Sequence, residues 1–273
     1  MLNAFSVDVE DYFQVNAFER AIPRASWGSF EPRVERNTRR LLDLCAEYGV
    51  RGTFFTLGWV AERWPGLVRE IRDAGHELAT HGQDHRQVTA MTPGQFRADV
   101  RRSKRTIEDA AGVEVIGYRA PSYSIVRETM WAVDVLAEEG FRYDSSIFPI
   151  HHDRYGIPDF PRFPRPLRGG VLQEFPISTI RVGRTNLPFV GGGYLRHFPM
   201  SFIRWGMRWL NQRERRPAVV YVHPWEIDPG QPVQPVGVLT RLRHYRNLGL
   251  TEGRLARLFS EYSFTTCREI LAL

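Results

Sequence analysis

Two histidines four residues apart, His81 and His85, are the side chains best spaced in this chain to bind one metal ion. They follow residues 75–80, which the sequence predicts to form a short strand. Open α/β sheets and barrels present their chemistry at the carboxyl ends of strands. The same spacing also fits two surface histidines in a polar loop, so the other strand ends must distinguish the two interpretations.

The first predicted strand, residues 4–9, ends in carboxylates. Because side chains alternate along a strand with a period of two, Asp8 and Glu10 project to the same side and Val9 to the other. Two carboxylates on one side can divide the work, one binding a metal and the other moving a proton. A polar loop cap is a fair alternative for the next residue, Asp11.

Further predicted strand ends carry Arg119, Asp144 and His223. An arginine in such a place is usually a surface residue, and an aspartate before two serines is usually a cap. His223 ends a strand of five apolar residues, where it is either a core histidine with satisfied hydrogen bonds or a catalytic group. One reactive residue type at each of several strand ends favours an active site.

The elements that would position these residues alternate along the chain. Strands are predicted over residues 4–9, 53–57, 75–80, 115–118, 141–143 and 218–222, with a last one near Phe264, and helices over residues 34–48, 59–74, 92–111, 128–139, 201–211 and 251–261. Such alternation predicts a parallel sheet or barrel with right-handed crossovers.

Residues 149–199 break this alternation and are rich in proline, glycine and arginine. We expect an insertion over the substrate cleft, with a hairpin around residues 172–182, inside a single domain that spans residues 1–273. Aromatic residues here could stack on sugar rings, although most of them are expected simply to anchor the segment on the barrel. They are Tyr155, Phe160, Phe163, Phe189 and Tyr194.

Composition limits the function classes. The hydrophobic fraction of 42% and the charged fraction of 25% are those of an ordinary soluble domain. No apolar run is long enough for a transmembrane segment and no signal peptide is evident, so we expect a cytoplasmic protein. The net charge of +6 comes from scattered arginines without a nucleic-acid motif. We therefore expect no specific nucleic-acid partner; peripheral contact with a membrane surface or an acidic, lipid-linked substrate explains the charge as well.

Together, these strand ends resemble the polysaccharide deacetylases of the NodB-homology type, carbohydrate esterase family 4. The resemblance runs from about residue 5 to residue 226, with the motifs in the right order. It implies a distorted (β/α)7 barrel of α/β class that removes acetyl groups from an N-acetylated saccharide. It also implies a divalent metal cofactor, most often zinc.

The resemblance assigns the metal ligands. His81 and His85 match the metal histidines. The second aspartate of the family's first motif is missing, because Val9 stands in its place. A branch of the family uses the acid two residues after the first aspartate, which is Glu10 here. We therefore assign Glu10 as the third ligand, in agreement with the alternation along the strand, and keep Asp11 as the alternative.

The resemblance also assigns the catalytic groups. Asp8 matches the base that takes a proton from water, and Arg119 matches the arginine that orients this base. His223 matches the acid that protonates the leaving amine, and Asp144 matches the aspartate that tunes this histidine. A neighbouring carboxylate would raise the pKa of an imidazole and fix its tautomer.

A substrate-binding wall is expected from Pro121, Ser122, Tyr123 and Trp225. The family's oxyanion donor corresponds to the Ser122 backbone N–H, although the motif around it differs from the usual one. The opening Val-Glu-Asp-Tyr-Phe is similar to the bacterial subgroup associated with exopolysaccharide and exosortase systems. Two alternatives stay open at this point: a cyclic-amide hydrolase that acts on allantoin-like rings, and a carbohydrate-binding barrel without catalysis.

Overall fold

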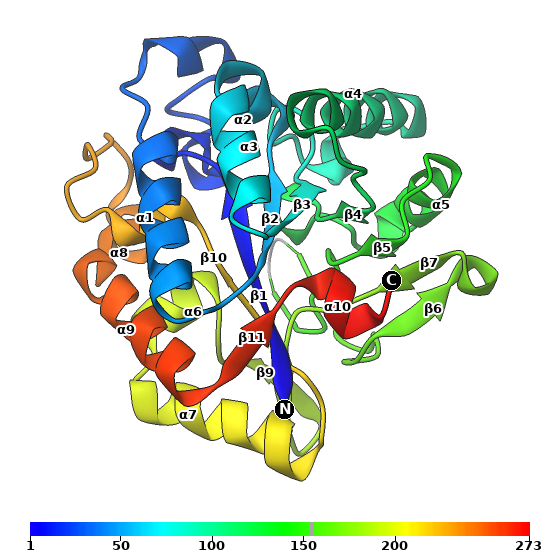
Figure 1. Ribbon diagram of the computed structural model, residues 1–273, viewed down its shortest axis with the longest axis vertical. Coiled ribbons are helices and arrows are strands. Elements are labelled where there is room, and N and C mark those ends of the chain that lie inside the picture. The colour runs from blue at the N-terminus through cyan, green and yellow to red at the C-terminus, as the bar shows by residue number, and fades with distance from the viewer. Residues whose placement is uncertain (153–154) are drawn as a thin grey trace.

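One curled, mainly parallel sheet forms the centre of the molecule, with most helices around it (Figure 1). The computed structural model describes residues 1–152 and 155–273. Within them, nine strands join in the order β10-β1-β2-β3-β4-β5-β7-β6, and β11 pairs with the start of β1. The strands are β1 (Leu2–Val9), β2 (Thr53–Thr56), β3 (Glu77–Thr80), β4 (Gly117–Tyr118), β5 (Tyr143–Asp144), β6 (Arg165–Leu167), β7 (Leu172–Glu174), β10 (Val219–Val222) and β11 (Ser263–Thr265).

The helices connect and cover these strands. They are α1 (Val34–Glu47), α2 (Gly58–Arg63), α3 (Pro65–Asp73), α4 (Pro93–Ala111), α5 (Trp131–Glu138), α6 (Gly192–His197), α7 (Met200–Arg208), α8 (Val238–Tyr245), α9 (Leu248–Glu261) and α10 (Cys267–Leu271). The helix predicted over residues 59–74 is in fact two helices, α2 and α3. Pro65 lacks an N–H and disfavours helical backbone at Trp64, so the first helix ends and a second begins.

Parallel register brings the carboxyl ends of the central strands to one edge of the sheet. β1 pairs with β10 up to Val7 and Val222 and with β2 up to Val9 and Thr56. β2 pairs in turn with β3 up to Thr56 and Thr80. Because the pairings of β1 with β10 and with β2 end at Val7 and Val9, close to each other along β1, the residues that follow β1, β3 and β10 emerge close together. This curled α/β sheet agrees with the distorted barrel that the family resemblance implies.

The hairpin expected around residues 172–182 is wrong. β7 lies in the main sheet, parallel to β5 and antiparallel to β6, whereas β8 (Thr179–Val182) pairs with β9 (Thr185–Pro188) in a separate two-stranded sheet. Pro176 separates β7 from β8, and the tight turn lies later, where Gly183 has a φ of 60°. Because Gly183 allows the tight turn, the hairpin is formed by β8 and β9, about one strand later in the chain than expected.

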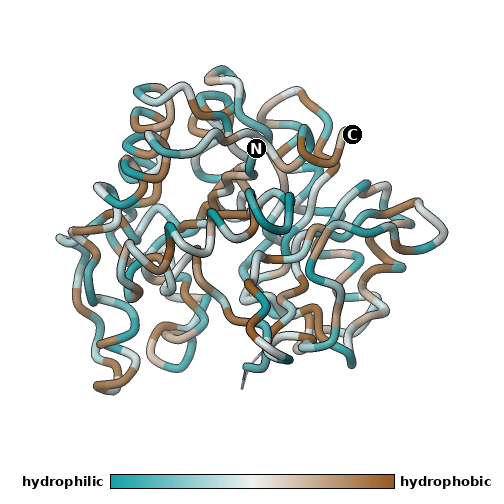
Figure 2. The backbone as a smooth tube through the Cα atoms, turned by 90° about the horizontal axis from the view of Figure 1, so that it is seen from below, coloured by the Kyte–Doolittle hydropathy of each residue, from teal (hydrophilic) through white to brown (hydrophobic). Residues whose placement is uncertain are grey.

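Figure 2 shows apolar and hydrophilic residues alternating along most of the chain, as amphipathic elements on a buried sheet require. The core is continuous from the strands into α1, α3, α4 and α9. Among the described residues, no helix combines the length and the apolar character that a membrane crossing needs.

Candidate metal centre and active site

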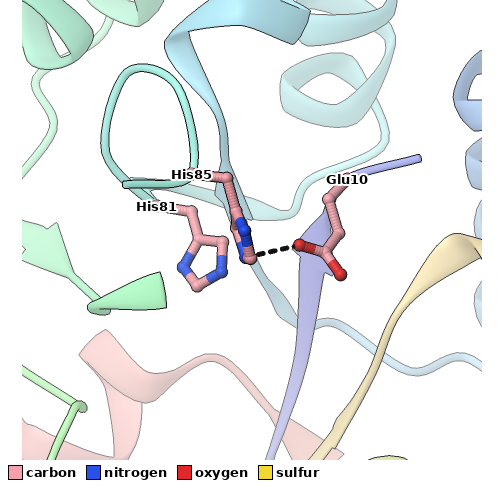
Figure 3. Close-up of side chains that lie close together, drawn as sticks. All are labelled: Glu10, His81 and His85. Atoms are coloured by element: carbon pink, nitrogen blue, oxygen red, sulfur yellow. Dashed lines mark ion pairs between the residues drawn. The ribbon is translucent and has the colours of Figure 1, made fainter. Parts of the chain in front are cut away.

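The three expected metal ligands, Glu10, His81 and His85, lie together at the carboxyl edge of the sheet (Figure 3). Glu10 follows β1, and His81 follows β3. The backbone N–H of His81 donates to the Thr56 carbonyl at 2.9 Å, which extends the pairing of β2 with β3 by one residue. All three side chains are buried, and their candidate ligand atoms lie within 4.8 Å of one another.

The loop after β3 turns back on itself, so that His85 returns to His81. Gly82 has a φ of 80°, and His85 itself has a φ of 50°, a left-handed conformation that is uncommon outside glycine. Arg24 holds this turn, because its guanidinium donates to the carbonyls of Asp84 at 2.8 Å and of His85 at 3.1 Å. The two histidines, four residues apart, are therefore brought together by this loop and not by a helical turn.

A polar partner holds each imidazole by its Nδ1 atom. His81 Nδ1 lies 2.8 Å from the Arg119 carbonyl oxygen, and His85 Nδ1 lies 3.1 Å from Asn16 Oδ1. An oxygen acceptor fixes the proton on Nδ1 and leaves the Nε2 lone pair for a metal. Burial lowers the pKa of His81 to about 4, so this ring is neutral at pH 7, as a ligand must be.

The Glu10 carboxylate fits a cation. Its Oε1 accepts a hydrogen bond from Trp225 Nε1 at 3.0 Å. Its Oε2 is buried and accepts no hydrogen bond, although His85 Nε2 lies only 2.6 Å away. Burial raises the pKa of Glu10, but the neighbouring histidines outweigh this and keep it below its usual range. Two imidazoles and one ionised carboxylate are a donor set that suits catalytic zinc.

Asp8 and Arg119 form a buried ion pair beside this group. Arg119 Nη1 donates to Asp8 Oδ1 at 2.6 Å and to Ser6 Oγ at 2.9 Å. The same guanidinium donates to the Ser145 carbonyl and hydroxyl at 3.1 and 3.0 Å. Because Arg119 is fully buried and held at four points, it fixes the direction of the Asp8 carboxylate. The structure thus brings Asp8 and Arg119 together, and their roles as base and orienting group stay predictions.

His223, which follows β10, faces the carboxylates of Asp8 and Glu10. Its Nε2 lies 3.8 Å from both Asp8 Oδ2 and Glu10 Oε1. Its Nδ1 lies 3.0 Å from Glu226 Oε2, and the other oxygen of Glu226 accepts a hydrogen bond from Arg196 Nε at 2.6 Å. A chain of three buried or half-buried groups, Arg196, Glu226 and His223, therefore ends in the cavity.

This chain favours a charged imidazole. Burial lowers the pKa of His223, but the hydrogen bond to Glu226 and the nearby carboxylates outweigh it and raise this pKa to about 9. Burial also raises the pKa of Glu226, yet Arg196 and His223 lower it to about 2. At neutral pH the pair is therefore a carboxylate and an imidazolium, which can act as a proton donor.

The expected role of Asp144 is corrected by the structure. Asp144 pairs in register with Glu174 of β7 and accepts a hydrogen bond from Ser146 Oγ. Burial raises the pKa of Asp144 to about 6. Glu226, and not Asp144, contacts His223. Glu226 stands three residues after His223, a spacing that could have identified it, whereas no signal in the sequence points to Arg196 as the next member of the chain.

The alternative ligand Asp11 is excluded by its contacts. Its Oδ1 accepts the N–H of Tyr12 at 2.8 Å, and its Oδ2 accepts those of Arg33 and Val34 at 2.6 and 2.8 Å. Asp11 thus satisfies backbone donors of two elements, the turn after β1 and the start of α1. The interpretation as a cap is right for Asp11, and Glu10 alone of the two faces the histidines.

The expected substrate wall is only partly correct. Ser122 and Tyr123 line the cavity, both with left-handed backbone at φ of 52° and 54°. Pro121 is buried and is not part of the lining. Trp225 lines the cavity but is only 5% exposed, and its indole N–H donates a hydrogen bond to Glu10. Its polar contact is therefore with a candidate metal ligand, while its ring stacks on His223 and His244.

The cavity around these groups has a volume of about 580 Å³. Part of its lining comes from the segment that we expect to cover the cleft. Of the aromatic residues in that segment, Tyr155 and Tyr194 line the cavity, whereas Phe189 is fully buried, and Phe160 and Phe163 pack on the core. The expectation that most of these rings anchor the segment agrees with these positions.

Two family models match consecutive segments of the chain, and Asp8 and Glu10 lie before both segments. Residues 23–143 match the polysaccharide deacetylase model, and residues 145–272 match a domain of unknown function, DUF3473. The first segment holds His81, His85 and Arg119, and the second holds His223 and Glu226. Strands from both segments lie in one sheet, because β7 pairs with β5.

Curated relatives are similar over part of the chain. A peptidoglycan deacetylase from Helicobacter pylori is 34% identical over 114 residues, which are 42% of this chain and 37% of the relative. A chitooligosaccharide deacetylase from Rhizobium leguminosarum bv. trifolii is 28% identical over 114 residues, which are 42% of this chain and 49% of the relative. The chain thus spans less than half the length of these relatives.

Solved structures are similar over nearly the whole chain. A Mycobacterium smegmatis structure, provisionally described as a polysaccharide deacetylase, has a TM-score of 0.64 at 21% identity and covers 97% of this chain and 85% of its own. A family 4 carbohydrate esterase from Streptomyces lividans, in complex with acetate, has a TM-score of 0.51 at 15% identity, with coverages of 97% and 91%. These likenesses confirm the predicted fold.

Proposed function

We propose that the chain, whose residues 23–143 match the polysaccharide deacetylase model, is a metal-dependent hydrolase that removes acetyl groups from N-acetylated sugars. One observation carries the proposal: a candidate metal group, an oriented carboxylate and a charged imidazole face a single cavity. Amide hydrolysis needs these three functions together, an activated water, a base and an acid for the leaving amine.

Glu10, His81 and His85 would hold the ion, which we propose to be zinc. When bound, a divalent ion there would lower the pKa of a water molecule and polarise the acetamide carbonyl. The donor groups are already oriented by Trp225, Asn16 and the Arg119 carbonyl, so little rearrangement is needed to bind it.

Asp8 is the proposed base. Arg119 occupies its Oδ1, so Oδ2 is the oxygen that faces the cavity, 3.8 Å from His223 Nε2. A carboxylate held in this way can accept the proton of the attacking water without losing its direction. His223, charged by its contact with Glu226, then gives the proton of its Nε2 to the departing amine. The products are acetate and an amino sugar.

We propose a saccharide that is part of a polysaccharide or a lipid-linked oligosaccharide in exopolysaccharide synthesis. The cavity mixes aromatic rings with basic side chains, among them Tyr155, Tyr194 and Arg243. Aromatic faces suit sugar rings, and the basic groups suit an acidic substrate. The cytoplasmic location expected from the sequence stays a prediction.

The test measures metal and product separately. The purified protein is analysed for bound metal, and acetate release is followed on oligomers of N-acetylglucosamine and on allantoin. We expect about one ion per chain and acetate only from the sugar. Metal with turnover of allantoin alone would support the cyclic-amide hydrolase, and an absence of metal at neutral pH would support a binding barrel.

A further inference from the structure

Residues 229–250, which include α8 and the start of α9, expose large aliphatic side chains beside the catalytic cavity. The most exposed lie on α8, where Val238 is 76%, Leu239 61% and Leu242 57% exposed. Their spacing places them on one face of the helix. The helix also lines the cavity through Thr240, Arg243 and His244. One short helix thus presents an apolar face to solvent and forms a wall of the cavity.

The charges of this segment have a single sign. Residues 229–250 contain three arginines, Arg241, Arg243 and Arg246, and no aspartate or glutamate. All three are exposed, and none forms an ion pair with a carboxylate within residues 1–152 and 155–273. On α4, by contrast, Arg97 and Arg101 are both paired with Glu139. Uncompensated arginines around exposed aliphatic groups match a partner that is both anionic and apolar.

We propose that this α8 surface, defined as Val238, Leu239, Leu242, Arg241 and Arg246, docks on an anionic phospholipid bilayer. A helix with aliphatic residues on one face and arginines beside them is the pattern of a helix that lies in a membrane interface. The aliphatic side chains enter the headgroup region and the arginines contact lipid phosphates.

Docking through α8 brings the cavity to the membrane. Because Thr240, Arg243 and His244 belong to both the helix and the cavity wall, the cavity opens beside the bilayer surface. A saccharide attached to a lipid carrier would then reach the metal group without leaving the membrane. This last step rests on the proposed function, whereas binding to the bilayer does not.

The test is flotation of the protein with vesicles of phosphatidylcholine alone or with about 30% phosphatidylglycerol. We expect binding to the anionic vesicles only. Leu239→Asp with Leu242→Asp should lower the partition coefficient about tenfold or more, since neither side chain lines the cavity or packs on the core. Val171→Asp with Val182→Asp is the matched control, because these residues are 63% and 48% exposed on other elements.

Further measurements exclude other occupants and separate the two proposals. Arg241→Glu with Arg246→Glu should weaken binding and reduce its dependence on salt. Equal losses in the Leu and Val pairs, or no binding of the natural chain, would overturn the proposal. So would a dimer that the Leu pair converts to monomer, because a second copy would then cover the face. Acetate release from soluble oligomers should be unchanged in the Leu pair; its absence in every variant, with lipid binding intact, would refute only the proposed function.

Discussion

The two walls of the catalytic cavity are held in place by different kinds of interaction. The metal wall, Glu10, His81 and His85, follows strands β1 and β3, which are joined through β2 by parallel backbone pairing. The acid wall, His223 and Glu226, follows β10 at the end of the sheet order and depends on a chain of charged side chains. Backbone register places Glu10 and His81 of the first wall, a loop held by Arg24 places His85, and side-chain partners place the second wall.

This difference decides how each wall should respond to substitution. Arg196 anchors the acid wall, because it binds Glu226 and also donates to the carbonyls of His244 and Arg246 at 2.6 and 3.2 Å. Loss of one member of a buried charged chain leaves its partner uncompensated. A ligand of the metal wall can be lost without disturbing the strands, whereas the acid wall should change with each member of its chain.

The largest effect is expected from His81→Ala. The strand pairing of its backbone is kept, so we expect a folded protein that binds less than about a tenth of the natural metal content and has no measurable turnover. Metal analysis and circular dichroism test this, with His76→Ala as a histidine control outside the cavity. A variant with full metal content would exclude His81 as a ligand.

Asp8→Asn should come next. The amide keeps the shape of the side chain and cannot accept the proton, so turnover should fall by about 10²- to 10⁴-fold while the metal stays bound. Kinetics at saturating substrate, together with metal analysis, separate the two effects. If the metal were lost and the activity per bound ion stayed normal, Asp8 would be a ligand and not the base.

Glu226→Gln tests the acid wall against Asp144→Asn. Glu226 raises the pKa of His223, so removal of its charge should let this pKa fall. As the proposed acid, His223 must be protonated to act. The alkaline limb of the kcat profile should therefore move to lower pH, and kcat at neutral pH should fall about tenfold. Asp144→Asn should leave the alkaline limb in place. A shift in the Asp144 variant alone would restore the role expected from the sequence.

The metal wall could be predicted from the sequence because its geometry follows from strand order. Asp8 and Glu10 share a side of a strand by the pleat alone, and the ends of neighbouring parallel strands must meet. The alternation of strands and helices predicts a parallel sheet or a barrel, and the family resemblance implied the distorted barrel. The alternation of side chains along the first strand and the order of the strands were enough to predict that these residues lie near one another, and the family resemblance assigned their roles.

The acid wall could not be predicted to the same degree. Whether Asp144 or Glu226 reaches His223 depends on how far the sheet curls and where a side chain turns, and order along the chain fixes neither. The indole of Trp225 is a similar case, since a residue beside the acid histidine can face the substrate or a ligand. Arg196 lies on α6, in the segment where the alternation of elements fails, so no pattern places it.

The smallest effect is expected from Trp225→Phe, which tests a hydrogen bond to the metal wall from a residue that also packs against the acid wall. Trp225 Nε1 donates to Glu10 Oε1 at 3.0 Å, and its ring stacks between His223 and His244 at centroid distances of 5.1 and 4.2 Å. Phenylalanine keeps most of the stacking and removes the donor.

Without this donor, Glu10 is oriented less firmly, and metal affinity should fall about tenfold, the lower end of what such supporting bonds contribute. Competition with a chelator of known affinity measures the change. Trp209→Phe is the matched control, because its indole N–H donates to Glu214 at 3.1 Å, outside the cavity. If the two variants bound metal equally well, the walls would be independent, and Trp225 would serve the acid wall alone by packing against His223.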